Sequence, residues 1–473
     1  MPFYSLSFLF FFLPAVLTGC WLSGQRLRSI FLLFASLLFY SWSSWNALPF
    51  LLVLISGNFF AGLLLDRLRN SWLRGLLFSL MIAANFFPLF YYRYFAFFLN
   101  GLSQLRPDWR LPLAPPDTSL TPLGISFITF HAVSYLADIF RRSAEAETNI
   151  VRLGLYFSFF PKIAAGPIQQ YAEVAARSSG MAGFANFSAG TERFIIGLSK
   201  KLLLANVLSE IAGQGFDCPA AELTTAAAWL GAVCYTLQIY FDFSGYSDMA
   251  IGLGLMCGYR LPENFTYPYA AQSVREFWRR WHITLSRWFR DYLYIPLGGS
   301  RHGELRTCVN LLLVFLLCGL WHGANWTFLI WGLLHGLFLV FERLFLAGLL
   351  AKLPRAVRHS YLLIFVIISW VFFREDSLYE AWLHLRAMAG FPINPLDNPW
   401  ILLKMDGQLF SVLIISTLLA FPFLKQGVQA ACSFAPLAVF VEIARGIALA
   451  ALFLLSLLEL ASGTQNAFIY FQF

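Results

Sequence analysis

Charged residues are scarce in this chain. Only 12% of its 473 residues are Asp, Glu, Lys or Arg, whereas 59% are hydrophobic and the mean hydropathy is +0.66. Soluble globular domains carry about 25% charged residues, so the composition excludes an ordinary soluble domain and predicts a polytopic membrane protein. The formal net charge of +8 gathers in loops, where it bears on membrane orientation and on binding of anionic membrane lipids; it does not predict binding to nucleic acid.

Patterns typical of metal sites, cleaved leaders and repeat-built transporters are also missing. The seven cysteines form no CxxC pair and no ligand spacing with histidine, so we expect free thiols and no metal site. The first 25 residues contain no Lys or Arg, which argues against a cleaved signal peptide, because such a leader begins with a basic region. No internal repeat is visible, so an inverted-repeat transporter gains no support.

Long apolar segments, in contrast, are abundant. Since about 20 apolar residues cross the hydrocarbon core as a helix, the candidate spans are residues 5–23, 30–40, 47–65, 76–98, 121–139, 192–213, 225–257, 309–341, 361–373, 409–424 and 438–460. Residues 150–171 are too short and too rich in proline and glycine to span, which favours a re-entrant or interfacial segment. The sequence therefore predicts an all-α polytopic membrane protein of about 11 transmembrane helices, in one domain that covers residues 1–473.

A histidine lies near the middle of one long apolar run. That run, residues 309–341, is too long for one perpendicular span, and we expect it to break near Gly319, Gly323 and Asn325. Irregular backbone at that depth occurs only where it is buried in protein or lines a watery cavity. His322 is therefore a candidate functional residue. A histidine that only satisfies a neighbouring helix is an equally good interpretation at this point.

Two carboxylates also lie within an apolar segment. Asp242 and Asp248 flank Gly245 in the sequence FDFSGYSD. Carboxylates in hydrocarbon are costly unless they are paired, hydrogen-bonded or placed in a water-filled cavity. The favoured interpretation is that they cap or bridge backbone freed by a bend at Gly245; a direct catalytic role is the alternative.

Residues 275–301, REFWRRWHITLSRWFRDYLYIPLGGSR, predict an amphipathic helix at the membrane surface. At 100° per residue, one face collects Phe277, Trp278, Trp281, Leu285, Trp288, Phe289 and Tyr292, and the other collects Arg279, Arg280, Arg287 and Arg290. His282 falls on the border between the faces. The basic face is either a lipid-headgroup anchor or a lip that receives a phosphorylated donor, because guanidinium groups suit phosphate oxygens.

Seven motifs follow one another along most of the chain. They are TPLGISFITFHAVSYLADIFR, FFPKIAAGPI, FDFSGYSDMAIGLG, ENFTYPY, EFWRRWHITLSRWFRDYLYIPLGG, GLWHGANWTFLIWGLLHG and the terminal FIYFQF. Each alone is weak, but in this number and order they resemble the membrane-bound O-acyltransferase (MBOAT) family, in its bacterial branch of alginate O-acetyltransferase type.

The resemblance implies a ring of membrane helices around a central funnel, and an acyl donor, usually acetyl-CoA, that arrives from the cytoplasm as a substrate. No bound cofactor is expected. It places the family's catalytic histidine at His322 and a second one at His282. His335, about 20 Å beyond His322 on an unbroken helix, matches a further position. The resemblance also implies a multi-pass protein of the bacterial inner membrane that works with a separate periplasmic acetyltransferase or polysaccharide-modifying partner.

The chemistry fits these residues. Transfer of an acetyl group from a thioester to a hydroxyl needs a base beside the attacking oxygen and an N–H donor for the oxyanion. A buried imidazole can be that base because burial disfavours its charged form, and an acetyl-imidazole intermediate is the alternative. The candidate residues are catalytic His322 and His282; donor-binding Arg279, Arg287, Arg290, Trp321 and Asn325; and supporting Asp242, Asp248 and His335.

Several acceptors stay open at this point. Alginate, cellulose or another secreted polysaccharide is compatible with the branch, and peptidoglycan O-acetylation and teichoic acid D-alanylation are neighbouring reactions. The rival class is a transporter or lipid-linked sugar flippase without transferase chemistry, which can also use Asp and His within the membrane. The motif set favours the transferase.

Overall fold

The computed structural model describes residues 1–43, 45–105, 116–117, 121–176, 183–393, 407–433, 435–463 and 468. Within these ranges the chain forms helices and no strand. It divides into two compact units, Met1–Arg193 with Met249–Pro262 and Phe194–Asp248 with Glu263–Phe473. Most of the Pro-rich loop at 101–119 and most of the terminal FIYFQF motif lie outside the described residues.

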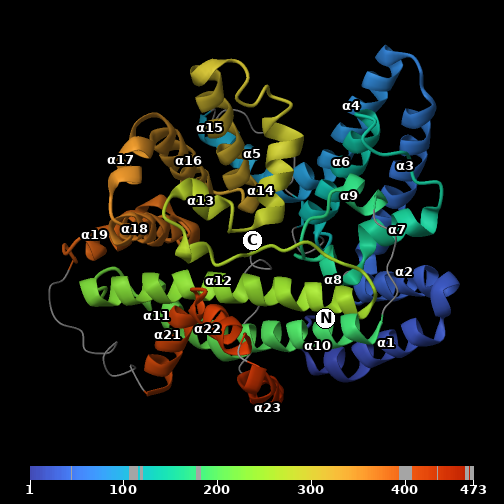
Figure 1. Cartoon of the computed structure of the whole chain (residues 1–473). Helices are drawn as coiled ribbons and strands as arrows, with labels where there is room; N and C mark the ends of the chain where they lie inside the picture. The colour runs from blue at the N-terminus through green and yellow to red at the C-terminus, as the bar shows by residue number, and fades with distance from the viewer. Residues whose placement is uncertain are drawn as a thin grey trace. The chain divides into compact units, whose positions relative to one another are not determined.

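The first unit is built around α6, which packs against α3, α4, α7 and α9 (Figure 1). Its elements are η1 (Phe8–Phe12), α1 (Leu13–Leu22), α2 (Gly24–Ser43), η2 (Trp45–Ala47), α3 (Leu48–Arg67), α4 (Ser71–Leu89), η3 (Phe90–Tyr94), α5 (Phe95–Leu105), α6 (Ile125–Phe140), α7 (Ile150–Ser158), α8 (Phe160–Ile163) and α9 (Tyr171–Ala175), with the start of α10 (Phe184–Ser199) and the end of α12 (Thr225–Met256). Every side chain of α6 from Ile125 to Ile139 is buried. Contacts on all sides bury its polar side chains, such as His131 and Asp138, together with its apolar ones.

The segment 150–171 forms the short helices α7 and α8, which agrees with its prolines and glycine. It carries a buried lysine, Lys162. The Nζ of Lys162 donates to Gln169 Oε1 at 3.0 Å and lies 4.3 Å from the centre of the Tyr156 ring. Polar and aromatic groups of the same unit therefore hold this lysine.

The second unit is organised around a hairpin of α15 and α16, which lie side by side (Figure 1). Its further elements are η5 (Lys200–Ala205), α11 (Asn206–Phe216), η6 (Pro268–Ala270), α13 (Val274–Trp278), α14 (Ile283–Phe289), η7 (Arg290–Tyr294), α15 (Gly303–His322), α16 (Trp326–Phe341), η8 (Glu342–Leu346), α17 (Ala347–Lys352), α18 (Arg355–Arg374), α19 (Leu378–Met388), α21 (Gly407–Leu419), α22 (Phe423–Cys432) and α23 (Ala435–Ala461). The hairpin is close-packed because Gly319 and Gly332 carry no side chain: a Cβ at either would overlap a backbone oxygen of the facing helix.

The break predicted in the run 309–341 is confirmed, but it separates two helices instead of bending one. α15 ends at His322 and α16 begins at Trp326. Asn325 caps the second helix, since its Oδ1 accepts a hydrogen bond from Thr327 N at 3.3 Å. His322 consequently stands at the end of a candidate span and not half-way along one.

Within the part of the chain that the structure describes, six helices are long and apolar enough to cross a membrane: Trp45–Arg67, Ser71–Gln104, Gly303–His322, Trp326–Lys352, Arg355–Arg374 and Leu437–Ala461. A seventh is added if Gly407–Leu419 and Phe423–Cys432, bent by 65°, count as one span. The described residues thus agree with an all-α polytopic membrane protein but do not confirm a count of about 11. Residues 192–213 and 225–257, which were expected to span, carry two lysines and two aspartates that pair with one another.

Candidate functional site

The arginine-rich stretch 275–301 is not the single helix that the sequence predicted. α13 and α14 are separated by a turn in which His282 adopts φ 41° and ψ 53°, the left-handed region. A helical wheel drawn around a single axis therefore does not describe the side-chain directions on both sides of that turn. His282, expected on the border of two faces, is fully buried.

The predicted division between aromatic and basic side chains nevertheless holds. Buried aromatic and aliphatic residues are Phe277, Trp278, Trp281, Leu285, Trp288 and Phe289, whereas Tyr292 is half-buried. Arg279 and Arg290 are exposed, and Arg280 and Arg287 are half-buried. Burial follows the chemistry of each side chain even where the helix is interrupted.

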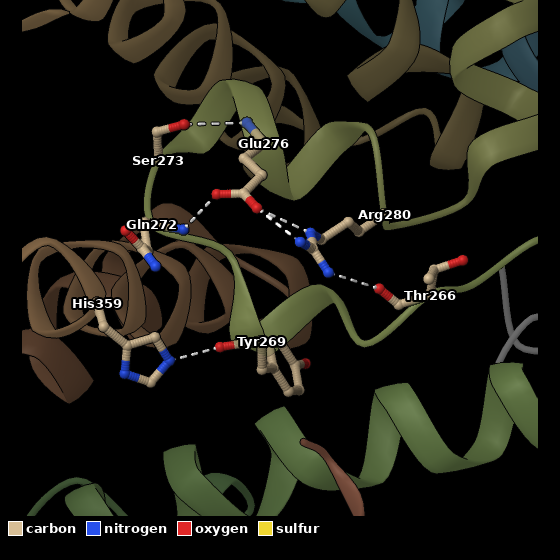
Figure 2. Close-up of polar contacts among 7 residues, drawn as sticks. All are labelled: Thr266, Tyr269, Gln272, Ser273, Glu276, Arg280 and His359. Carbon is tan, nitrogen blue, oxygen red and sulfur yellow. Dashed lines mark hydrogen bonds and ion pairs between the residues drawn. The ribbon is translucent and has the colours of Figure 1, made fainter. Parts of the chain in front are cut away.

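A set of polar contacts fastens α13 to the segment before it (Figure 2). The Oγ of Ser273 caps the helix by accepting from Glu276 N at 3.1 Å. The Glu276 carboxylate accepts from Gln272 N at 2.9 Å and pairs with Arg280 at 2.7 Å. Arg280 in turn donates to the carbonyl oxygen of Thr266 at 3.4 Å. The turn that carries His282 is therefore held from both sides.

Asn264, in the motif ENFTYPY, contacts His282 directly. Its Oδ1 lies 3.0 Å from His282 Nδ1 and also accepts from Thr284 N at 3.3 Å and Thr284 Oγ1 at 2.9 Å. Burial lowers the pKa of His282 to about 3, so the imidazole is neutral at ordinary pH. Asn264 is not among the site residues predicted from the sequence. The only signal was an amide inside a motif used for the family resemblance.

His322 lies among aromatic rings at the end of α15. Its ring centre is 4.8 Å from Trp321, 4.9 Å from Phe373 and 5.0 Å from Trp331. Trp321 also lies 6.0 Å from the ring of His282. The two histidines predicted to be catalytic thus both contact one indole.

His335 belongs to the same aromatic cluster. Its Nδ1 accepts a hydrogen bond from Trp278 Nε1 at 3.1 Å, and its ring lies 4.8 Å from Trp331, which also contacts His322. The hairpin brings together two histidines that a straight helix would separate by about 20 Å. These contacts make His335 a support for the indoles of Trp278 and Trp331.

A pocket of about 580 Å³ opens beside this cluster and shares Trp278 with it. Its charged lining consists of Arg275, Arg279, Arg290, Arg343 and Arg358, with Glu276 and Glu342. The rest is mainly apolar. Of the three arginines predicted to bind a donor, Arg279 and Arg290 line the pocket and Arg287 lies outside the lining. Such a site suits an anionic group joined to a less polar arm.

One helix face leads from this pocket to His322, and a second lining helix begins directly after His282. The lining residues are Leu311, Val314, Phe315 and Cys318 on α15, and Leu285, Ser286 and Phe289 on α14. Residues spaced by three or four share one face of a helix. His322 extends the α15 face by one turn beyond the pocket. His282 lies in the left-handed turn directly before α14, three residues ahead of the lining residue Leu285.

The two carboxylates of α12 form ion pairs with adjacent lysines of η5. Lys201 Nζ lies 2.9 Å from Asp242 Oδ1, with side chains 3% and 1% exposed, and Lys200 Nζ lies 2.7 Å from Asp248 Oδ2, with side chains 24% and 8% exposed. The predicted bend at Gly245 is wrong, because α12 runs unbroken through it. The aspartates therefore pair with cations and do not cap freed backbone. Two lysines in the preceding apolar segment were the missed signal.

Asn325 has a structural part in the turn after His322. Besides capping α16, its Nδ2 donates to the carbonyl oxygen of Asp376 at 2.7 Å, which ties the turn to the connection between α18 and α19. Among the residues that the structure describes, no three His, Cys, Asp or Glu side chains gather as metal ligands would.

Comparison with the sequences of known proteins shows the family to which the chain belongs. The sequence profile of the membrane-bound O-acyltransferase (MBOAT) family matches residues 123–378, more than half of the chain. The chain belongs to this family. It is therefore an O-acyltransferase, which decides against a transporter or flippase without transferase chemistry. Both histidines of the site fall within the match.

Three relatives match most of the chain. It is 39% identical over 429 residues to the probable alginate O-acetylase AlgI of Azotobacter vinelandii, which covers 89% of this chain and 83% of the relative. It is 36% identical over 498 residues to the probable alginate O-acetylase AlgI of Pseudomonas putida, over the full length of both. It is 35% identical over 419 residues to the peptidoglycan O-acetyltransferase of Helicobacter pylori, which covers 81% of this chain and 79% of the relative.

Proposed function

We propose that this protein O-acetylates a secreted polysaccharide from the bacterial inner membrane, taking acetyl groups from cytoplasmic acetyl-CoA and passing them across the bilayer. The acceptor is a polymer of the alginate or cellulose kind. Relatives named for acetylation of alginate and of peptidoglycan support acetyl transfer to a polymer. The observation that carries the proposal is the α15 face that runs from the arginine-edged pocket to His322, with His282 beside it against the ring of Trp321.

The pocket is the proposed donor site. Arg279 and Arg290 are exposed at its edge, where guanidinium groups can bind the phosphates of acetyl-CoA. Arg343 and Arg358 add charge from the end of the α15–α16 hairpin opposite His322. Because arginine and lysine accumulate on the cytoplasmic side of membrane proteins, this basic end is assigned to the cytoplasm. The apolar lining takes the less polar arm that carries the thioester.

In the proposed reaction, His322 acts as a neutral imidazole. It accepts the proton of the acceptor hydroxyl while that oxygen bonds to the thioester carbonyl carbon. The Trp321 N–H is the proposed donor to the developing oxyanion. Collapse of the tetrahedral intermediate breaks the C–S bond, and the proton returns to the departing thiolate. His282 supports this step through its contact with Trp321.

The test is the variant His322→Ala in purified protein reconstituted into proteoliposomes. Release of free CoA from acetyl-CoA and acetyl incorporation into polymer are expected to fall by at least about 100-fold. His131→Ala is the matched control, since His131 is also buried but belongs to α6 of the first unit. Normal acetylation by a well-inserted His322→Ala protein would overturn the proposal.

The variant His282→Ala distinguishes a supporting role of His282 from a role equal to that of His322. We expect measurable residual turnover, because the proposed base at His322 remains in place. Complete loss of turnover in a folded His282→Ala protein would make the two histidines equal partners in the chemistry.

The proposal includes a separate periplasmic partner that presents the polymer. At the His322 end of the hairpin the described connections are short: Gly323–Asn325 links α15 to α16, and Glu375–Ser377 links α18 to α19. Such turns offer little surface for gripping a long sugar chain. The purified chain is expected to bind or hydrolyse acetyl-CoA but to acetylate free polymer poorly until the partner is added. Efficient acetylation of polymer by the chain alone would contradict this.

A further inference from the structure

We propose that Asn264 is a positioning residue for acetyl transfer: its side-chain oxygen holds His282 with the proton on Nδ1, so that Nε2 is the basic nitrogen. This inference rests on the proposed function, in which His282 supports the transfer at His322. Asn264 is the residue that fixes which nitrogen of His282 carries the proton.

The hydrogen bonds fix which way the Asn264 amide points. Thr284 N is a backbone N–H that can only donate, and it lies 3.3 Å from the same Asn264 atom that faces His282 Nδ1, so this atom is the oxygen. The amide nitrogen, on the other side, donates to Ser247 Oγ at 3.1 Å. An oxygen can only accept, and so His282 Nδ1 must be the donor. The neutral ring then carries its lone pair on Nε2.

The same residue fixes an unfavourable backbone. His282 adopts φ 41° and ψ 53°, a conformation that is unfavourable for a residue with a side chain and persists only where its surroundings enforce it. The carbonyl oxygen of Asn264 accepts from Ile283 N at 2.9 Å, and its side chain accepts from Thr284 N. Three consecutive residues of the turn therefore bond to Asn264, which sets both the backbone and the ring of His282.

The surroundings of the His282 ring are apolar. Its ring contacts are Phe243 at 4.7 Å, Trp321 at 6.0 Å and Phe265 at 6.4 Å. Three titratable residues are neighbours in sequence of these contacts or of Asn264: Asp242, Glu263 and His322. Asp242 pairs with Lys201, and Glu263 is exposed. Burial is the cause of the lowered pKa of His282. A carboxylate at position 264 would therefore act on the ring at hydrogen-bond distance and in a low dielectric.

Because a carboxylate and an amide at position 264 would act differently on the His282 ring, two substitutions test the positioning role of Asn264. Asn264→Ala removes the acceptor, and kcat is expected to fall about 10- to 100-fold at every pH while the KM for acetyl-CoA stays within about twofold. Asn264→Asp keeps the acceptor oxygen but adds a charge that raises the pKa of His282 and stabilises the imidazolium. Its activity is expected to be low at acidic pH and to recover as the pH rises. Both are measured as CoA release by the full chain in proteoliposomes.

A merely structural amide gives a different result. Loss of structure alone would lower both variants by a pH-independent factor. Asn85→Ala is the matched control, because Asn85 is a buried amide of the first unit that bonds reciprocally to Asn58. It is expected to lower stability and to leave kcat and the pH profile unchanged. The turn keeps other ties in the Asn264 variants, since Thr266 N still donates to Arg280 O at 3.0 Å.

A second measurement does not depend on turnover. In protein labelled with ¹⁵N-histidine, the His282 signals, identified by their loss in His282→Gln, are expected to show the Nδ1-protonated neutral ring at pH 7, and the imidazolium in Asn264→Asp. Wild-type kcat in Asn264→Ala, or an unchanged pH profile together with a neutral ring in Asn264→Asp, would overturn the inference. If wild-type protein neither binds acetyl-CoA nor releases CoA from it, the proposed function fails while the ¹⁵N signals still decide the role of Asn264.

Discussion

Replacement of Lys201 by methionine is expected to destabilise the second unit by about 3–5 kcal/mol, the usual cost of breaking a buried ion pair from one side. The Lys201 ammonium lies 2.9 Å from Asp242 Oδ1, and both side chains are almost fully buried. Methionine is unbranched and fills much of the same volume, so the cavity left behind is small. Most of the loss comes from the Asp242 carboxylate, which stays in a low dielectric after its neighbouring cation has gone.

The adjacent ion pair provides a matched control on the same two elements. Lys200 Nζ lies 2.7 Å from Asp248 Oδ2, which is closer than the Lys201 pair, but the Lys200 side chain is 24% exposed. If distance decided the energy, Lys200→Met would be the more damaging substitution. Water reaches the Lys200 end of this pair and screens it, so we expect a smaller loss than for Lys201→Met. The Asp248 carboxylate left behind is only 8% exposed, which keeps the expected loss at about 1–3 kcal/mol. Burial, not separation, sets the order of the two variants.

The assay is unfolding by sodium dodecyl sulfate of protein held in a mild non-ionic detergent, followed by far-ultraviolet circular dichroism. The double variant Lys201→Met with Asp242→Leu removes both charges and is expected to recover most of the lost stability, because a buried pair is often replaceable by apolar residues. A Lys201→Met protein as stable as Lys200→Met would refute the reasoning. So would a double variant no more stable than the single one.

Three further outcomes are expected. Arg279→Glu should raise the KM for acetyl-CoA about 10- to 100-fold with kcat little changed, whereas Arg287→Glu, outside the pocket, should not; loss of membrane association alone would favour a lipid-headgroup anchor. Gly332→Ala should reduce the yield of folded protein, since a Cβ there overlaps the backbone of α15, while Gly348→Ala, with open space around it, should be neutral by circular dichroism. The pKa of His282 is about 3 in the folded protein and about 6.5 in an unfolded chain. The stability that this histidine contributes is therefore present above pH 6.5 and is lost as the pH falls toward 3. His282→Gln should flatten this part of the curve of stability against pH.

Features set by a short stretch of sequence were predictable. The helix break after His322 follows from Gly323 and the capping side chain of Asn325, both within three residues of it. The burial of Phe277 and Trp288 follows from the chemistry of each side chain, and it survived the wrong assumption of one continuous helix. Local signals of this kind do not depend on which helix lies opposite.

Features set by contacts distant in sequence were not predictable. The left-handed turn at His282 depends on Asn264, which lies in a different segment, and nothing in RRWHITLS itself marks the turn. Asp242 forms an ion pair with Lys201, which lies on another helix. The sequence of α12 alone does not reveal this partner, and it suggested a bend at Gly245 that the structure does not have. The described residues do not confirm the predicted number of spans. Helices that bury paired charges against protein, as α12 does, resemble apolar spans in sequence.

The position of His322 bears on how an acetyl group crosses the bilayer in the proposed function. α15 has 20 residues, so the basic end of the hairpin and His322 lie about 30 Å apart, close to the thickness of the hydrocarbon core. The pocket face on α15 begins at Leu311, and from there to His322 the distance is about 16 Å. A donor whose phosphates stay at the arginines can therefore extend its thioester along that face toward the far end of the span. The acceptor is then met at the three-residue turn after His322, so the polymer does not have to enter the membrane, and no alternating opening of the protein to its two sides is required for transfer.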